Sequence, residues 1–341
     1  MAESYITPRQ THDEFFPYSG CKEDQLRFLL RYAVLAPSHY NAQPWKFRLH
    51  SDGIEIIKNA SRAALTVDPQ LRELTISCGA AVRMIEVAAR YFALEPQVIF
   101  PSDNQSDFLA RIELIDRHEP SDQDALLFHA IKERQTNRGL FTDAIIPNEV
   151  TKSCLASARE LGVELGFTHN KRLKMAFASL TAFAVRHQLS LPWYRLEFAS
   201  WMRSSISLKP DGMTGFGFFA SNLPSPLART TMKWLNRGKQ IGIFNKNKVI
   251  TASPILAVIS TDADSQESWI NTGRLLSDLL LKLTTVGLSA SFMNQAIQEP
   301  KLRKQVAKLF SCEAKPQLVL RIGVAEKVQW TPRMPVDDCI I

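Results

Sequence analysis

The sequence predicts an α+β fold built from two tandem, related halves, each with an antiparallel or mixed sheet flanked by helices. Two observations lead to this prediction. Stretches with helical periodicity alternate with short runs of strand-forming residues along the chain. The same order of elements also occurs twice, and Arg9-Gln10-Thr11 recurs as Arg134-Gln135-Thr136. We place the first half at residues 1–125 and the second at 126–341.

The first half begins with a predicted helix over residues 23–35, which is rich in apolar residues and stopped by Pro37. A β-hairpin follows, with strands at Trp45–Leu49 and Ile54–Ile57 joined by an Asp-Gly turn signal. A long buried helix then extends from about Leu71 to Phe92, and we expect Asp68 to cap it and Pro69 to lie in its first turn. Strands at 97–100 and 109–114 and a helix over 122–132 complete this half.

The second half repeats this order and adds an insertion. The predicted elements are a helix from about Asn148, strands at 163–168, 255–260 and 316–324, and a buried helix from Trp269 that Gly287 ends. The insertion spans residues 190–248 and is rich in aromatic residues, among them Phe216, Phe218 and Phe219. It is interpreted either as a packed helical cover or as a lid over a bound ligand. A membrane contact is a further alternative.

Composition limits the possible partners. The 41 Lys and Arg residues are scattered and nearly matched by 34 acidic residues, so we expect no nucleic-acid partner despite the net charge of +7. No stretch reaches 18 apolar residues and no apolar leader begins the chain, so we expect a cytoplasmic protein without membrane spans. Five dispersed cysteines and seven histidines lack metal-ligand spacing, so we predict no metal.

Four polar segments carry the candidate binding residues. Residues 36–45, Ala-Pro-Ser-His-Tyr-Asn-Ala-Gln-Pro-Trp, form a loop that two prolines stiffen and that presents hydroxyl and amide groups. Residues 131–141, Ile-Lys-Glu-Arg-Gln-Thr-Asn-Arg-Gly-Leu-Phe, carry arginine forks suited to phosphate or carbonyl oxygens. The other two are residues 287–295 and 330–335. The structural alternatives are a Pro-rich connection, a solvated helix end and an exposed tail.

These segments resemble the hallmarks of the nitroreductase-like FMN-binding family. The loop resembles the family's PSSxNxQPW segment, and the basic stretch resembles its Arg-Arg-Ser-x-Arg-x-Phe segment, with Gln135 as a departure. The fused halves, the DPxxRELxISCGAA stretch at residues 68–81 and the aromatic insertion resemble the Acg subfamily over most of the chain.

The resemblance implies that the cofactor is FMN and assigns residues to it. The loop would contact the flavin. The basic segment would bind the phosphate, the ribityl chain and the pyrimidine edge of FMN. A backbone amide in residues 287–295 would donate a hydrogen bond to the flavin N5 atom. A C-terminal arginine would be a second phosphate ligand. The residues so assigned are Ser38, His39, Asn41, Arg134, Thr136, Arg138, Asn294, Gln295 and Arg333.

The resemblance also implies one FMN per chain. Only the first half has the loop, and only the second has the complete basic segment. At the position that matches Arg138, the first half has Asp13, whose carboxylate would repel a phosphate. We therefore expect an intrachain pseudo-dimer, either as a monomer or within a homodimer.

The expected activity is that of an FMN-dependent oxidoreductase, which transfers hydride from NAD(P)H to a nitroaromatic, quinone or similar electrophile by a ping-pong mechanism. No side chain is assigned as catalytic, because the flavin carries the chemistry. The alternative is an FMN-storage or redox-sensing protein whose lid hinders turnover. A structural protein that has lost the flavin is a third class, which the retained polar residues disfavour. Rossmann and P-loop motifs are missing.

Overall fold

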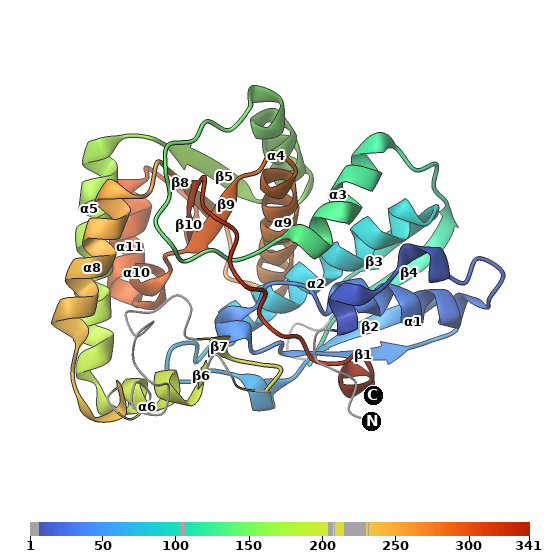
Figure 1. Ribbon diagram of the computed structural model, residues 1–341, viewed down its shortest axis with the longest axis horizontal. Coiled ribbons are helices and arrows are strands. Elements are labelled where there is room, and N and C mark those ends of the chain that lie inside the picture. The colour runs from blue at the N-terminus through green and yellow to red at the C-terminus, as the bar shows by residue number, and fades with distance from the viewer. Residues whose placement is uncertain (1–6, 103–106, 204–206, 208, 215–229, 231) are drawn as a thin grey trace.

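The computed structural model describes residues 7–102, 107–203, 207, 209–214, 230 and 232–341. It has an α+β architecture with two four-stranded antiparallel sheets, ordered β1-β2-β4-β3 and β5-β8-β10-β9, each flanked by helices (Figure 1). The predicted α+β class is confirmed. A short parallel pair, β6 (Met202–Arg203) and β7 (Met213–Thr214), lies within the aromatic insertion.

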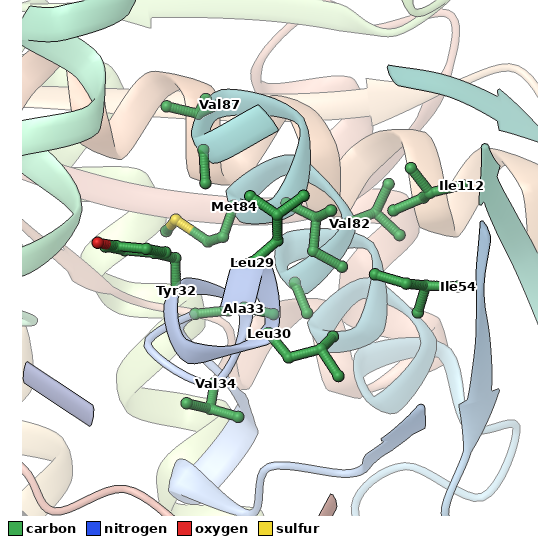
Figure 2. Close-up of a cluster of buried hydrophobic side chains, with 14 of the residues drawn as sticks. Leu29, Leu30, Tyr32, Ala33, Val34, Ile54, Val82, Met84, Val87 and Ile112 are labelled. Atoms are coloured by element: carbon green, nitrogen blue, oxygen red, sulfur yellow. The ribbon is translucent and has the colours of Figure 1, made fainter. Parts of the chain in front are cut away.

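The first sheet packs against the N-terminal helices. The predicted hairpin forms, with Phe47 opposite Ile56. Leu29 of the first helix is fully buried, and Figure 2 shows it gathered with apolar side chains of the next helix and of the sheet. The elements are α1 (Lys22–Ala33), β1 (Trp45–Leu49), β2 (Gly53–Lys58), α2 (Arg72–Tyr91), β3 (Leu94–Ile99), β4 (Phe108–Arg117) and α3 (Asp122–Glu133).

The second sheet is covered on both faces. Along β8, Ile255 and Ala257 pack with α4 and α9, whereas Leu256 and Val258 pack with α5, α8, α10 and α11. Every residue of β8 is therefore buried, and its sequence lacks polar alternation. The elements are α4 (Asn148–Glu160), β5 (Glu164–Thr168), α5 (Lys171–Ser190), α6 (Pro192–Ser200), α8 (Gly238–Thr251), β8 (Ile255–Thr261), α9 (Gln266–Thr285), β9 (Ser289–Phe292), α10 (Gln295–Gln298), α11 (Pro300–Leu309) and β10 (Lys315–Gly323).

The long helices α2 and α9 cross at the centre of the molecule (Figure 1). Their backbones touch at two glycines. A Cβ atom on Gly79 would lie 2.2 Å from the Ile270 carbonyl oxygen, and one on Gly273 would lie 2.0 Å from the Ile76 carbonyl oxygen. Only residues without a side chain allow this approach. The crossing fixes the sheets relative to each other and sets the floor of the cavity described below.

The start of α2 differs from the prediction. The helix begins at Arg72, after Leu71 takes a left-handed conformation with φ of 58°, so Pro69 lies before the helix and not in its first turn. Asp68 still stabilises the N-terminal end of the helix, because its carboxylate accepts a hydrogen bond of 2.9 Å from the backbone amide of Leu74.

The described residues contain no helix that is long and apolar enough to cross a membrane. Within the same residues, no group of three or more His, Cys, Asp or Glu side chains gathers as a potential metal site. Phe216, Phe218 and Phe219 of the insertion lie outside the described residues.

Candidate functional site

A large cavity opens between the central helices and the aromatic insertion. Its volume, counted with its open mouth and all the space between the lining atoms, is about 1230 Å³. Segments far apart in the sequence meet in its wall. Six of the nine residues assigned from the sequence line it: Ser38, His39, Thr136, Arg138, Asn294 and Gln295.

The loop that follows α1 enters the wall in a strained conformation. Tyr40, Asn41 and Gln43 all have positive φ angles, between 51° and 56°, which side-chain-bearing residues rarely adopt. The loop is fixed by hydrogen bonds, since the Gln43 amide donates to the Ser38 hydroxyl at 2.9 Å and the Gln43 side chain donates to the Pro210 carbonyl at 2.8 Å. Strain of this kind persists where surrounding contacts enforce it, and it is concentrated at functional sites.

A buried ion pair anchors the same loop to α2. The Nδ1 atom of His39 contacts the Glu73 carboxylate, which also accepts hydrogen bonds from Arg72 at 3.0 Å and from Gln298 at 3.1 Å. Burial alone would raise the pKa of Glu73, but the charge and hydrogen bond of His39, followed by Arg72, lower it to about 2. Burial would lower the pKa of His39, but Glu73 raises it above its ordinary value. Glu73 therefore favours the protonated form of His39, which lines the cavity.

Glu73 and Gln298 line the cavity but were not singled out from the sequence. Glu73 lies in the stretch at residues 68–81 that supported the family resemblance. The available signal was an acidic residue at the start of a helix that the sequence predicts to be buried.

The basic segment runs beside β9. Thr136 pairs with Ala290 in an isolated parallel bridge, and the Asn137 amide donates to the Ala290 carbonyl at 3.1 Å. This pairing places Thr136 and Arg138 in the cavity wall, near the 291–295 segment. In that segment the Asn294 side-chain oxygen accepts a hydrogen bond of 3.1 Å from the Val319 amide, which fixes the turn into α10.

The other three assigned residues, Asn41 of the loop, Arg134 and Arg333, do not line the cavity. Arg333 is 3% exposed and donates to the Asn41 side-chain oxygen at 3.0 Å. Arg134 is 2% exposed, and both arginines donate to the carbonyl of Leu35 at 3.4 Å. Arg9 adjoins them and donates to the carbonyl of Lys132 at 2.5 Å. Sequence reasoning noted Arg9 only as the repeat counterpart of Arg134.

The side chains of Arg9, Arg134 and Arg333 form a cluster that has few negatively charged partners. We call it the Arg9–Arg134–Arg333 cluster. Burial lowers the pKa of Arg134 to about 10. Burial and then the charge of Arg134 lower that of Arg9 to about 9, although Glu133 acts in the opposite direction. Burial and the other two arginines lower that of Arg333 well below its ordinary value. Within the described part of the chain, the Nε atoms of all three lack a hydrogen-bond partner.

Buried guanidinium groups without counter-charges are unfavourable, and a bound oxyanion would satisfy them with charge-assisted hydrogen bonds. The cluster therefore has the chemistry of an anion site.

The insertion supplies another wall of the cavity. Tyr194 and Phe198 of α6 and Phe244 of α8 line it. Trp193 and Trp234, which were counted among the insertion's aromatic residues, are instead 58% and 74% exposed.

No family model matches the chain, but several known proteins are similar to it over most of its length. "Putative NAD(P)H nitroreductase Rv3131" of Mycobacterium tuberculosis is 28% identical over 328 residues, covering 93% of this chain and 91% of the relative. "Putative NAD(P)H nitroreductase acg" of the same organism is 24% identical over 333 residues, covering 92% and 95%. The chain is thus similar, over more than nine-tenths of its length, to nitroreductase-like proteins of the Acg type.

Solved structures similar to this chain include the FMN and NADPH-dependent nitroreductase NfnB from sphigopyxis sp. strain HMH. It is 16% identical, with a TM-score of 0.40, and the match covers 63% of this chain and 97% of that one. A nitroreductase with bound FMN from Bacteroides fragilis is 11% identical with a TM-score of 0.37, covering 61% and 94%.

Proposed function

We propose that this protein is an Acg-type, cytoplasmic, FMN-dependent NAD(P)H oxidoreductase that reduces a nitroaromatic, quinone or similar electrophile in a ping-pong cycle. One observation carries the proposal. The loop after α1 and the basic segment after α3 meet in a single cavity, and the Arg9–Arg134–Arg333 cluster lies directly behind that loop.

The residues present fit FMN. Buried Nε atoms of Arg134 and Arg333 without partners suit a phosphate, which would occupy the anion site that the cluster forms. Thr136 supplies a hydroxyl for the ribityl chain, and Arg138 a fork for the polar edge of the ring. The cavity lining combines these polar groups with aromatic and apolar side chains, as ligand sites do. Bound FMN would supply the hydride-accepting and hydride-donating chemistry.

The protein's own residues would bind the flavin, orient it and shield it from solvent. The loop of Ser38, His39 and Asn41 is held in one strained conformation, so its polar groups are preorganised. The 294–295 turn is fixed by the hydrogen bond from Val319 to Asn294 and can present a backbone amide to the ring. Aromatic residues of α6 and α8 line the cavity and would shield a bound ring from water. No side chain is assigned as an acid or a base.

We also propose that residues 1–125 and 126–341 take the place of two subunits, with one FMN per chain, in a monomer or a homodimer. Residues 190–248 would act as the lid. A lidded FMN-storage or redox-sensing protein is the second candidate, which the aromatic wall from the insertion favours, because that wall restricts access of donors and acceptors.

Steady-state kinetics test the proposal. NADPH or NADH oxidation by the FMN-reconstituted protein is followed with a quinone or a nitroaromatic as acceptor. We expect turnover that requires added FMN and parallel lines in double-reciprocal plots. Stoichiometric FMN uptake without turnover would favour the storage or sensing candidate, and a protein that takes up no FMN would overturn both.

A further inference from the structure

The α8 helix presents one mixed face to the cavity. Phe244, Asn245 and Lys248 follow Ile241 by three, four and seven residues, so the four share a face, and all four line the cavity. This face is apolar and aromatic at Ile241 and Phe244, and it carries the cation Lys248 at its other end. Tyr194 and Phe198 of α6 also line the cavity, with their rings 6.2 Å apart and nearly parallel. The walls thus favour a flat aromatic ligand.

Lys248 joins two further cations in the cavity lining, Arg138 and Arg321. Its Nζ atom donates to the Arg138 carbonyl and lies 4.7 Å from the centre of the Phe244 ring. Arg321 is 1% exposed, lies over the Phe141 ring at 3.9 Å and donates to the Gly139 carbonyl at 2.7 Å. In the described residues, no carboxylate lies within ion-pair distance of Lys248 or Arg321.

The local field at this end is positive. Burial, followed by repulsion from Arg321 and Arg138, lowers the pKa of Lys248 to about 8. Burial and then Arg138 lower that of Arg321 to about 10. No acidic group offsets either shift. A negative group bound here would relieve this repulsion.

FMN alone does not account for this second set of cations. It carries one phosphate, for which the Arg9–Arg134–Arg333 cluster lies behind the wall, whereas Lys248 and Arg321 line the cavity itself. Lys248 also belongs to the insertion and not to the segments that resemble the flavin-binding motifs.

We propose that the cavity takes a negatively charged aromatic acceptor, a nitro- or quinone-bearing aryl carboxylate or sulfonate, whose anionic group binds Lys248 and whose ring packs between the aromatic residues of α6 and α8. This inference rests on the proposed function and specifies its substrate class. Lys248 is a specificity residue in this account, because it touches the part of the acceptor that is not reduced.

Calorimetric titration with a matched pair of ligands tests the inference without turnover. The probes are 4-nitrobenzoate and the neutral 4-nitrobenzamide, added to the FMN-loaded protein. We expect the anion to bind roughly tenfold to a hundredfold more tightly, the range of a charge-assisted contact. Lys248→Gln should abolish this preference and leave the nitrobenzamide Kd unchanged. Lys239→Gln, an exposed cation on the same helix, is the matched control and should retain the preference.

The pH dependence gives an independent readout. Because the pKa of Lys248 is lowered to about 8, the side chain is charged below that pH and loses its proton above it. The preference for the anion should therefore fall between about pH 7 and about pH 9 in the wild-type protein and stay flat in Lys248→Gln.

Three outcomes would overturn the inference: equal Kd values for the two probes, equal weakening of both by Lys248→Gln, or an unchanged preference accompanied by a shifted flavin midpoint potential. In each case FMN uptake and bleaching by NAD(P)H would leave the proposed function intact. The same titration on FMN-free protein separates the two proposals further. Lys248 and Arg321 are in place without the cofactor, so the preference should persist even if FMN loading fails.

Discussion

The Arg9–Arg134–Arg333 cluster yields the sharpest quantitative prediction. Arg134→Gln removes a guanidinium whose Nε and Nη1 atoms lack partners among the described residues, and Arg333→Gln removes one whose Nε does. Each would donate at least one charge-assisted hydrogen bond to the FMN phosphate, worth about 1.5–3 kcal/mol. Each substitution should therefore weaken FMN binding by roughly tenfold to 150-fold. Riboflavin lacks the phosphate, so its Kd should change little.

The same substitutions should have the opposite effect on the FMN-free protein. Removing a buried cation that has no counter-charge should leave thermal stability unchanged or raise it. Flavin fluorescence titrations with FMN and riboflavin, together with melting curves, measure both effects. Arg27→Gln is the control, because Arg27 is exposed and pairs with the exposed Asp337 at 2.7 Å. Equal weakening of FMN and riboflavin, or a similar effect of Arg27→Gln, would refute the assignment of the phosphate site.

Three further predictions concern the cavity and its floor. Gly273→Ala should lower the free energy of unfolding by about 1–3 kcal/mol in urea denaturation, because its Cβ would lie 2.0 Å from the Ile76 carbonyl oxygen; an unchanged midpoint would contradict the tight α2–α9 crossing. Arg138→Glu should strip flavin from the purified protein without unfolding it, and retained flavin absorbance with normal circular dichroism would exclude Arg138 from the site. Because the pKa of Glu73 is lowered to about 2, its ionised form stabilises the fold above the ordinary carboxyl pKa, and this contribution is lost as the pH falls toward about 2. Glu73→Gln should flatten this acid dependence of urea stability, and an unaltered slope between about pH 3 and about pH 6 would count against the His39–Glu73 pair.

The elements that carried strong periodicity were predictable. The helix α2 and the hairpin of β1 and β2 form close to their expected bounds, because their apolar spacing reflects which face is buried. β9 was not predicted as a strand, since Ser289–Phe292 is short and its pairing with β10 comes from tertiary contacts. Pro69 was wrongly placed in the first turn of α2, because Asp68 bonds to Leu74 across a left-handed Leu71, a local geometry that spacing does not encode.

The candidate site was predictable where its residues are contiguous in sequence. Ser38 and Thr136 were assigned from segments that resemble family motifs, and the structure brings both to one cavity. Glu73, Lys248 and Arg321 were not assigned, because they come from the first turn of a helix, the insertion and a buried strand, respectively. Only the fold brings such residues together, so no local pattern marks them as part of the cavity wall.

Reduction of the bound flavin tests the central claim most directly. The purified FMN-loaded protein is mixed anaerobically with NADPH and, separately, with NADH, and the flavin absorbance is followed. The proposed function predicts rapid bleaching by at least one donor and recovery of the colour when a nitroaromatic or quinone is added. A protein that stays yellow with both donors, yet bleaches with dithionite, would contradict the oxidoreductase assignment and favour a lidded flavin-binding role.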